Sequence, residues 1–166
     1  MSSYFITVNE RIGLGKNLIE FLKSLSETTN DDGSASFTDI ETHFGLLTVY
    51  GSIIGVFGSR QPRFDNDLSG HLSDFEKIFP GRQICFAGDL NITFSGQPWP
   101  SNKARQALVD TFKKYGLTNT TANMADTVDH IVLSNDFLDS KQLEIETWNT
   151  DKKLSDHVGH LLTLKQ

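Results

Sequence analysis

An apolar run that ends abruptly in Gly-Asp-Leu-Asn is the feature that most constrains this sequence. The four apolar residues Ile84 to Ala87 lie between Pro80-Gly81 and Gly88, which predicts a short strand buried on both faces. Such a strand delivers Asp89 and Asn91 to a sheet edge, and their spacing of two points both the same way on an extended backbone. Because Gly, Asp and Asn are also common turn formers, a plain turn is the alternative interpretation.

Composition predicts one domain over residues 1–166, since the chain has 166 residues of which 37% are hydrophobic and 22% charged. The net charge of -6 does not favour bulk attraction to nucleic acid, although it leaves room for a local basic patch. The single cysteine, Cys85, lies in the apolar strand and excludes an internal disulfide. No secretory signal or membrane span is recognisable, so we expect a cytoplasmic protein without membrane association.

Hydrophobic periodicity and turn residues predict strands and helices along the whole chain. Tyr4–Val8 predicts a strand, and residues 14–25 an amphipathic helix. A short strand over 36–42 precedes two β-branched runs, 46–50 and 53–57, which we interpret as a hairpin with its turn at Gly51-Ser52. The remaining predictions are a helix capped among residues 65–67 and ending before Pro80, a helix capped by Ser101 and ending at Gly116, a polar connection over 117–121, and strands over 128–133, 143–148 and 158–164.

Polar residues interrupt two of the later apolar strands. Asp129 and His130 open one of them, and Ser155-Asp156-His157 stands just before the last. A buried carboxylate or imidazole without a partner costs several kcal/mol, on the order of 2–7 for a polar group, so such residues usually face each other or a metal. Asp129 beside His157 would hold the imidazole in one tautomer and favour its charged form, which can bind a phosphoryl oxygen.

The order of these motifs resembles the endonuclease/exonuclease/phosphatase superfamily, whose fold is that of DNase I. The motifs are Gly-Asp-Leu-Asn at 88–91, Asp-His-Ile-Val-Leu-Ser at 129–134 and Ser-Asp-His at 155–157, and the match covers about residues 53–164. The resemblance implies an α/β fold, a four-layer-type sandwich of two mixed or antiparallel β-sheets with outer helices, shortened in its N-terminal half. An exposed sheet edge left by that shortening predicts a homodimer.

The resemblance also implies roles for individual residues. It makes Asp89 the group that orients or deprotonates water, Asn91 the holder of the scissile phosphate, and Asp129 with His157 the remaining catalytic residues. The metal ligands it implies are Asp156 with Glu41, for which Glu10 is the alternative, and Asn9. The family's usual tyrosine falls near Phe57, which cannot donate a hydrogen bond, so Tyr50 and Arg60 are alternatives for binding substrate. Trp99, in a loop with two prolines, is either one wall of the substrate pocket or a packing residue.

These residues predict a divalent-metal-dependent hydrolase of phosphodiester bonds. Carboxylate ligands without a cysteine cluster favour Mg²⁺ or Mn²⁺ over Zn²⁺. A nuclease acting on DNA or RNA is the first hypothesis, supported by Trp99, Arg60 and Lys103. A phosphatase or phosphodiesterase of a small phosphorylated metabolite or lipid headgroup suits the acidic charge, and a degenerate, partner-binding domain is the third hypothesis. We expect His43, His71 and His160 to be surface or packed residues and His130 to face away from Asp129.

Overall fold

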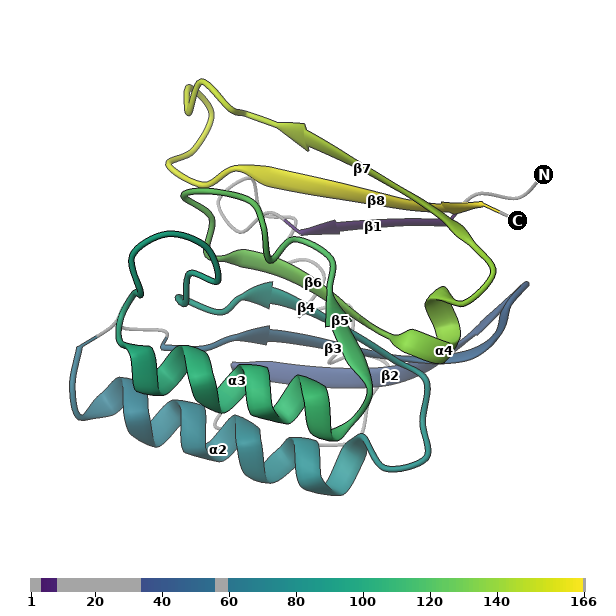
Figure 1. The fold of residues 1–166 in the computed structure, drawn as a ribbon, viewed down its shortest axis with the longest axis horizontal. Helices are drawn as coiled ribbons and strands as arrows, with labels where there is room; N and C mark the ends of the chain where they lie inside the picture. The colour runs from purple at the N-terminus through teal and green to yellow at the C-terminus, as the bar shows by residue number, and fades with distance from the viewer. Residues whose placement is uncertain (1–3, 9–33, 56–59, 166) are drawn as a thin grey trace.

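Two β-sheets and a layer of helices make up the computed structural model, which describes residues 4–8, 34–55 and 60–165. Figure 1 shows α2 and α3 side by side beneath the larger sheet, with the smaller sheet above it. The larger sheet has the order β2 (Ala35–Thr42), β3 (Gly45–Ile53), β4 (Ile84–Asp89), β6 (Asp129–Ser134) and β5 (Leu117–Asn119). The smaller has the order β1 (Tyr4–Val8), β8 (Gly159–Lys165) and β7 (Gln142–Trp148). The helices are α2 (Arg63–Ile78), α3 (Asn102–Lys114) and the short α4 (Asn135–Leu138).

The central strand β4 is buried on both faces, as its apolar run predicts. Phe86 faces the core between the larger sheet and the helices, where it contacts Tyr50 and Phe75. Cys85 faces a second core that lies between the two sheets and includes Ile131 and Leu162. Burial raises the pKa of the Cys85 thiol to about 12, so this cysteine is an inert packing residue. Two sheets with one core between them and a second core beneath the helices confirm the predicted α/β sandwich.

The predicted hairpin with its turn at Gly51-Ser52 is wrong. β3 runs unbroken from Gly45 to Ile53, and the chain reverses earlier, between β2 and β3. Gly51 and Ser52 instead lie opposite Ala87 and Gly88 of the parallel neighbour β4. A Cβ added at Gly88 would overlap the Ser52 carbonyl, and the φ of Gly88 is +155°. Small residues meet here because the two backbones approach closely, not because the chain turns.

The other predicted elements hold with small changes. Ser101 caps α3 by accepting a hydrogen bond of 3.1 Å from the Ala104 N–H. α2 begins at Arg63, ahead of the expected capping residues 65–67, and Pro62 makes no side-chain cap. The expected polar connection at 117–121 contains the short strand β5, paired with β6. The helix expected over 14–25 and the residues 56–57 lie outside the described residues.

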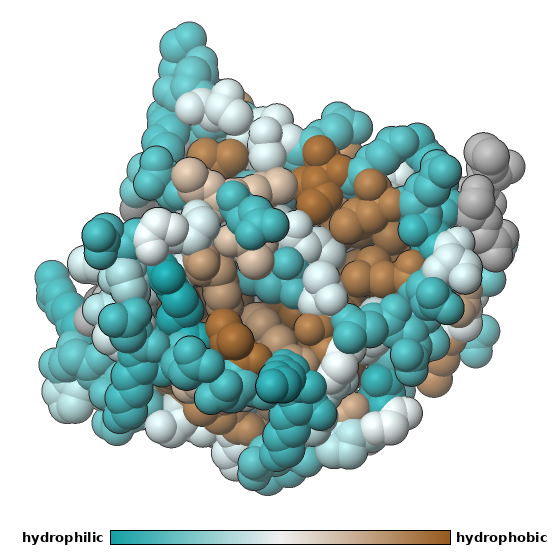
Figure 2. Space-filling view, in the orientation of Figure 1, coloured by the Kyte–Doolittle hydropathy of each residue, from teal (hydrophilic) through white to brown (hydrophobic). Residues whose placement is uncertain are grey.

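Surface properties agree with a helix layer exposed to water on its outer side. Figure 2 shows mostly hydrophilic side chains over α2 and α3, and hydrophobic ones between α3 and the β7–β8 hairpin. Among the described residues no helix is long and apolar enough to cross a membrane.

β7 is an edge strand of the smaller sheet, and most of its side chains are exposed. Pairing of a sheet edge with a second copy and a cytoplasmic location stay predictions.

Candidate active site

Two aspartates face each other where β4 ends and β6 begins. In the antiparallel register of the two strands, Asp89 lies directly opposite Asp129. Side chains in such a pair share one face of the sheet, with Cβ atoms about 5 Å apart. Asp89 is 5% exposed and Asp129 is fully buried. Two buried carboxylates so close repel each other, so each needs its own stabilising partner.

Asn91 is the partner of Asp89. Its backbone N–H donates to Oδ1 of Asp89 at 2.9 Å, and its side-chain Nδ2 donates to Oδ2 at 3.1 Å. The same Nδ2 donates to the carbonyl of Ile54 at 2.9 Å. Both amide hydrogens are therefore directed at acceptors within the protein, so the amide presents its oxygen to a ligand. The role expected of Asn91 as the holder of the scissile phosphate stays a prediction.

His157 is the partner of Asp129. Its Nδ1 donates to Oδ2 of Asp129 at 2.7 Å, and the imidazole is 13% exposed. Because an ionised carboxylate only accepts, Nδ1 carries the hydrogen, which fixes the tautomer of the neutral imidazole. The two residues come from different sheets: Asp129 begins β6, and His157 precedes β8. The pairing expected of these two interruptions is therefore present in the geometry.

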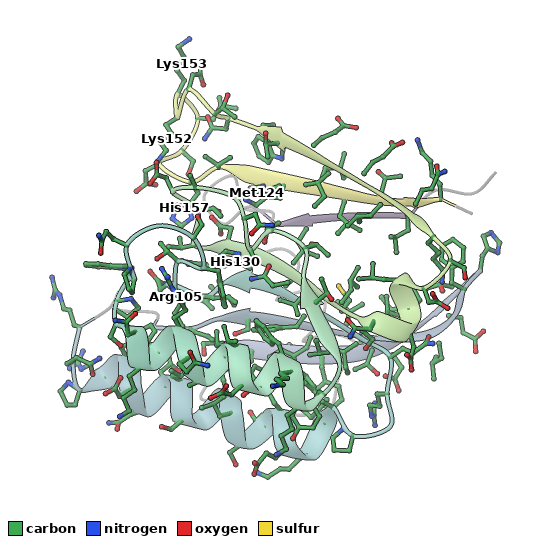
Figure 3. The ribbon with its side chains drawn as sticks, in the orientation of Figure 1. Arg105, Met124, His130, Lys152, Lys153 and His157 are labelled. Atoms are coloured by element: carbon green, nitrogen blue, oxygen red, sulfur yellow. The ribbon has the colours of Figure 1, made fainter. Side chains whose placement is uncertain are left out.

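The loop that carries His157 is fastened by Asn149 at the end of β7. Nδ2 of Asn149 donates to the carbonyls of Ser155 at 2.8 Å and His157 at 2.6 Å, while its Oδ1 accepts from the Leu154 N–H at 2.9 Å. Ser155 adds a bond of 3.1 Å from the His157 N–H to its Oγ. The imidazole is thus presented by a loop with its own hydrogen bonds. Figure 3 shows His157 at the same end of the molecule as Arg105 and His130, below Lys152 and Lys153.

Two buried histidines support the aspartates from behind. His130 faces away from Asp129, as expected, and its Nε2 donates to the Ile92 carbonyl at 2.9 Å while Nδ1 bonds Thr121 at 2.9 Å. Burial lowers the pKa of His130 to about 4, and the nearby His160 adds to that effect. Nε2 of His160 bonds the Thr127 hydroxyl at 3.0 Å, and Thr127 accepts from the Asp129 N–H at 3.2 Å. Burial lowers the pKa of His160 as well. Both imidazoles are therefore neutral at pH 7, and their hydrogen bonds hold the segments that carry Asp89 and Asp129.

A chain of hydrogen bonds from α2, through residues 54–55 after β3, also holds the Asn91 amide. The Asp67 carboxylate of α2 accepts from the Gly55 N–H, next to Ile54, whose carbonyl holds the Asn91 amide. Oδ1 of Asp67 is 3.8 Å from Nε2 of His71, and Nδ1 of His71 is 3.1 Å from the Tyr50 hydroxyl. His71 is fully buried and is a packing residue, as expected. Sequence periodicity does not reveal such supports, because their partners are backbone atoms of distant segments.

Other predicted site residues fall in different places. Tyr50 is fully buried among aromatic rings, so its expected contact with substrate is wrong. Glu41 pairs in register with Leu46, seven residues before the Ile53 that lies opposite Asp89. That is about 23 Å along the strand, so Glu41 cannot share an ion with the aspartates and its assignment as a metal ligand is wrong. Arg60 and Trp99 are exposed, and Asp156 is exposed beside His157. Asn9, Glu10 and Phe57 lie outside the described residues.

Divalent cations were expected here, and the donor chemistry of this edge suits a hard ion. Asp89, Asn91 and Asp156 supply oxygen donors, and Cys85 is buried in the core. Within the described ranges, no three His, Cys, Asp or Glu side chains converge as a metal cluster. Mg²⁺ commonly uses one or two carboxylates and completes its octahedron with water and substrate, so the expected hard ion does not require such a cluster.

Known structures share this fold. The chain superposes on the endonuclease domain of TRAS1, a telomere-specific non-LTR retrotransposon, with a TM-score of 0.63 and 16% identity over 99% of both chains. For the AP endonuclease LMAP from Leishmania major, the TM-score is 0.63 at 11% identity, over 84% of this chain and 57% of that one. For an endonuclease/exonuclease/phosphatase from Beutenbergia cavernae, the TM-score is 0.57 at 14% identity, over 79% of this chain and 39% of that one.

These likenesses identify the fold as that of the endonuclease/exonuclease/phosphatase proteins, as the motif order predicted. No family model matches the sequence, and no curated protein does. The chain spans well under two thirds of the Beutenbergia and Leishmania structures, so what those whole proteins do comes to this chain only as a proposal.

The buried histidines predict a loss of stability on mild acidification. The unfolded chain takes up a proton near the ordinary His pKa of 6.5, whereas folded His130 does so only near pH 4. The free energy of unfolding should therefore fall by about 2 kcal/mol from pH 7 to pH 5 on account of His130, with His160 adding to the loss. Urea titrations at intervals of half a pH unit measure this. His130→Gln should flatten the slope and His43→Gln should not; equal slopes in all three proteins would contradict the assignment.

Proposed function

We propose that this protein hydrolyses phosphodiester bonds. The observation that supports the proposal most strongly is the buried Asp129 carboxylate that orients His157, directly across the strand pair from Asp89. A carboxylate and an oriented imidazole on one sheet edge are the groups that attack by water on a phosphorus centre requires. The fold neighbours agree, because three of them are described as endonucleases or as an endonuclease/exonuclease/phosphatase.

In this proposal the residues of the site activate the water, bind the phosphate and hold the cation. Asp89 accepts the proton of the attacking water, and the oxygen of the Asn91 amide accepts that water's second hydrogen. His157, when both of its nitrogens carry hydrogen, donates from Nε2 to a non-bridging phosphoryl oxygen, while Asp129 balances its charge. A divalent cation, when bound, supplies further neutralisation of the phosphate charge. The oxygen donors proposed for it are Asp156 and the outward oxygens of Asp89 and Asn91.

Nucleic acid is the substrate that we propose first. Two of the fold neighbours are named for action on nucleic acid, and the exposed side chains of Arg60, Trp99 and Lys103 offer charge and a stacking surface. A small phosphorylated metabolite or lipid headgroup is the second candidate, favoured by the net charge of -6, which repels a long polyanion.

The activity itself is tested with bis(p-nitrophenyl) phosphate, plasmid, single-stranded DNA and RNA in Mg²⁺ or Mn²⁺. We expect turnover of the generic diester and of at least one nucleic acid. His157→Ala should lower kcat/KM by about 10²-fold or more, because it removes a donor to the transition-state charge. His43→Ala is the matched control, since His43 is an exposed histidine beside the β2–β3 turn. Absence of turnover on all four substrates by the folded protein would contradict the proposal.

Cation binding is tested separately by measuring the unfolding temperature Tm with and without the ion. If Asp156 ligates a hard cation, Mg²⁺ or Mn²⁺ should raise Tm through mass action, and Asp156→Asn should diminish that rise. Glu41→Gln is the control, because it removes a carboxylate from the far end of the same sheet and should leave the rise intact. A rise that survives Asp156→Asn unchanged, or that Glu41→Gln removes, would show that the ion binds elsewhere.

A further inference from the structure

An exposed tryptophan stands on the loop that follows the catalytic strand. Trp99 is 54% exposed, whereas the other Phe, Tyr and Trp side chains whose burial the structure describes are buried or half-buried. The loop belongs to the candidate site by connectivity, because Thr93 follows Asn91 by two residues and its N–H donates to the Trp99 carbonyl at 3.0 Å. The Trp99 N–H in turn donates to the Thr93 hydroxyl at 3.0 Å.

Arg105 of α3 holds this loop in one conformation. Its Nε donates to the Thr93 carbonyl at 2.6 Å, and Nη1 and Nη2 each donate to the Gly96 carbonyl at 3.2 Å. Nη2 also bonds the Thr93 hydroxyl at 3.0 Å and the Ser95 carbonyl at 3.3 Å. The loop is further tied to the segment before β6, since the Ser95 hydroxyl donates to the Met124 carbonyl at 2.7 Å.

This rigidity matters because the entropy of ordering the loop is already lost on folding. An exposed indole on a backbone that is already ordered presents a flat apolar surface that a ligand can cover without ordering the loop. Trp99 is the largest apolar side chain that this loop leaves exposed.

Chain geometry limits how far Trp99 lies from the aspartates. Only Ile92 separates Asn91 from Thr93, and Thr93 is hydrogen-bonded to Trp99 through its N–H and its hydroxyl. The Cα atoms of Asn91 and Trp99 are therefore within about 13 Å. That distance spans a few nucleotides of a single strand whose bases are stacked about 3.4 Å apart. Figure 3 places Arg105 and Met124, which hold the loop, at the same end as His157.

We propose that Trp99 is a stacking platform for one unpaired nucleobase, a few nucleotides or less from the phosphate held at Asp89 and His157. This inference rests on the proposed function and specifies its substrate class as single-stranded nucleic acid. A paired base is already stacked on both faces inside a duplex, whereas an unpaired base has a free face for the indole. Stacking also suits a protein with a net charge of -6, which gains little from bulk attraction to phosphates.

Fluorescence of Trp99 tests the platform without any turnover. The chain has two tryptophans, so Trp148→Phe leaves Trp99 as the single reporter. Oligothymidylate, titrated with EDTA present, should quench this emission. An oligomer of the same length with abasic residues, which keeps the phosphates and lacks the bases, should not. Equal quenching by the two oligomers, or by oligothymidylate and a matched duplex, would overturn the proposal.

Affinity measurements on variants complete the test. Loss of one base–aromatic stack costs about 1–3 kcal/mol, so Trp99→Ala should weaken oligothymidylate binding about 5- to 150-fold. Trp99→Phe should retain most of the affinity. Leu46→Ala is the matched control, because Leu46 is 52% exposed near the β2–β3 turn, far from the aspartates. Unchanged affinity in Trp99→Ala would overturn the platform while leaving the hydrolysis of a generic diester as a separate result.

Discussion

The hydrogen bond between Asp129 and His157 is the interaction on which the site depends. Asp129 is fully buried in the larger sheet, while His157 comes from the loop that enters the smaller sheet. Breaking a buried pair of this kind by removing one partner costs about 3–5 kcal/mol. The same contact therefore joins the two sheets at one edge and fixes the tautomer of the imidazole.

A network of hydrogen bonds keeps the second carboxylate in place. Asp89 is stabilised by hydrogen bonds from Asn91, and the Asn91 amide is aimed by the Ile54 carbonyl and, through Gly55, by Asp67 of α2. His130 donates a hydrogen bond to the carbonyl of Ile92, the residue after Asn91. A site built in this way has its polar groups oriented before a ligand arrives, which is the arrangement that electrostatic stabilisation of a transition state requires.

Much of this arrangement is legible in the sequence, where apolar runs place the strands and their polar interruptions mark Asp89, Asp129 and His157. Strand direction is not legible, which is why Glu41 was misassigned: β2 is antiparallel to β3, so its last residues lie at the far end of the sheet. Tyr50, an alternative to the family's tyrosine near Phe57, is buried in the core under α2, and a motif position alone does not say which face of a strand meets the core. Arg105 carries no sequence signal either, since its partners are mainly backbone carbonyls of a loop.

A double-mutant cycle on Asp129 and His157 tests the central claim most directly. The measured quantity is kcat/KM for a generic phosphodiester, with circular dichroism to establish that each variant is folded. If Asp129 acts through the imidazole, Asp129→Asn should lose much of what His157→Ala loses, and the double variant should be little worse than either single one. Losses that multiply as independent factors would contradict the account, as would normal turnover in folded His157→Ala.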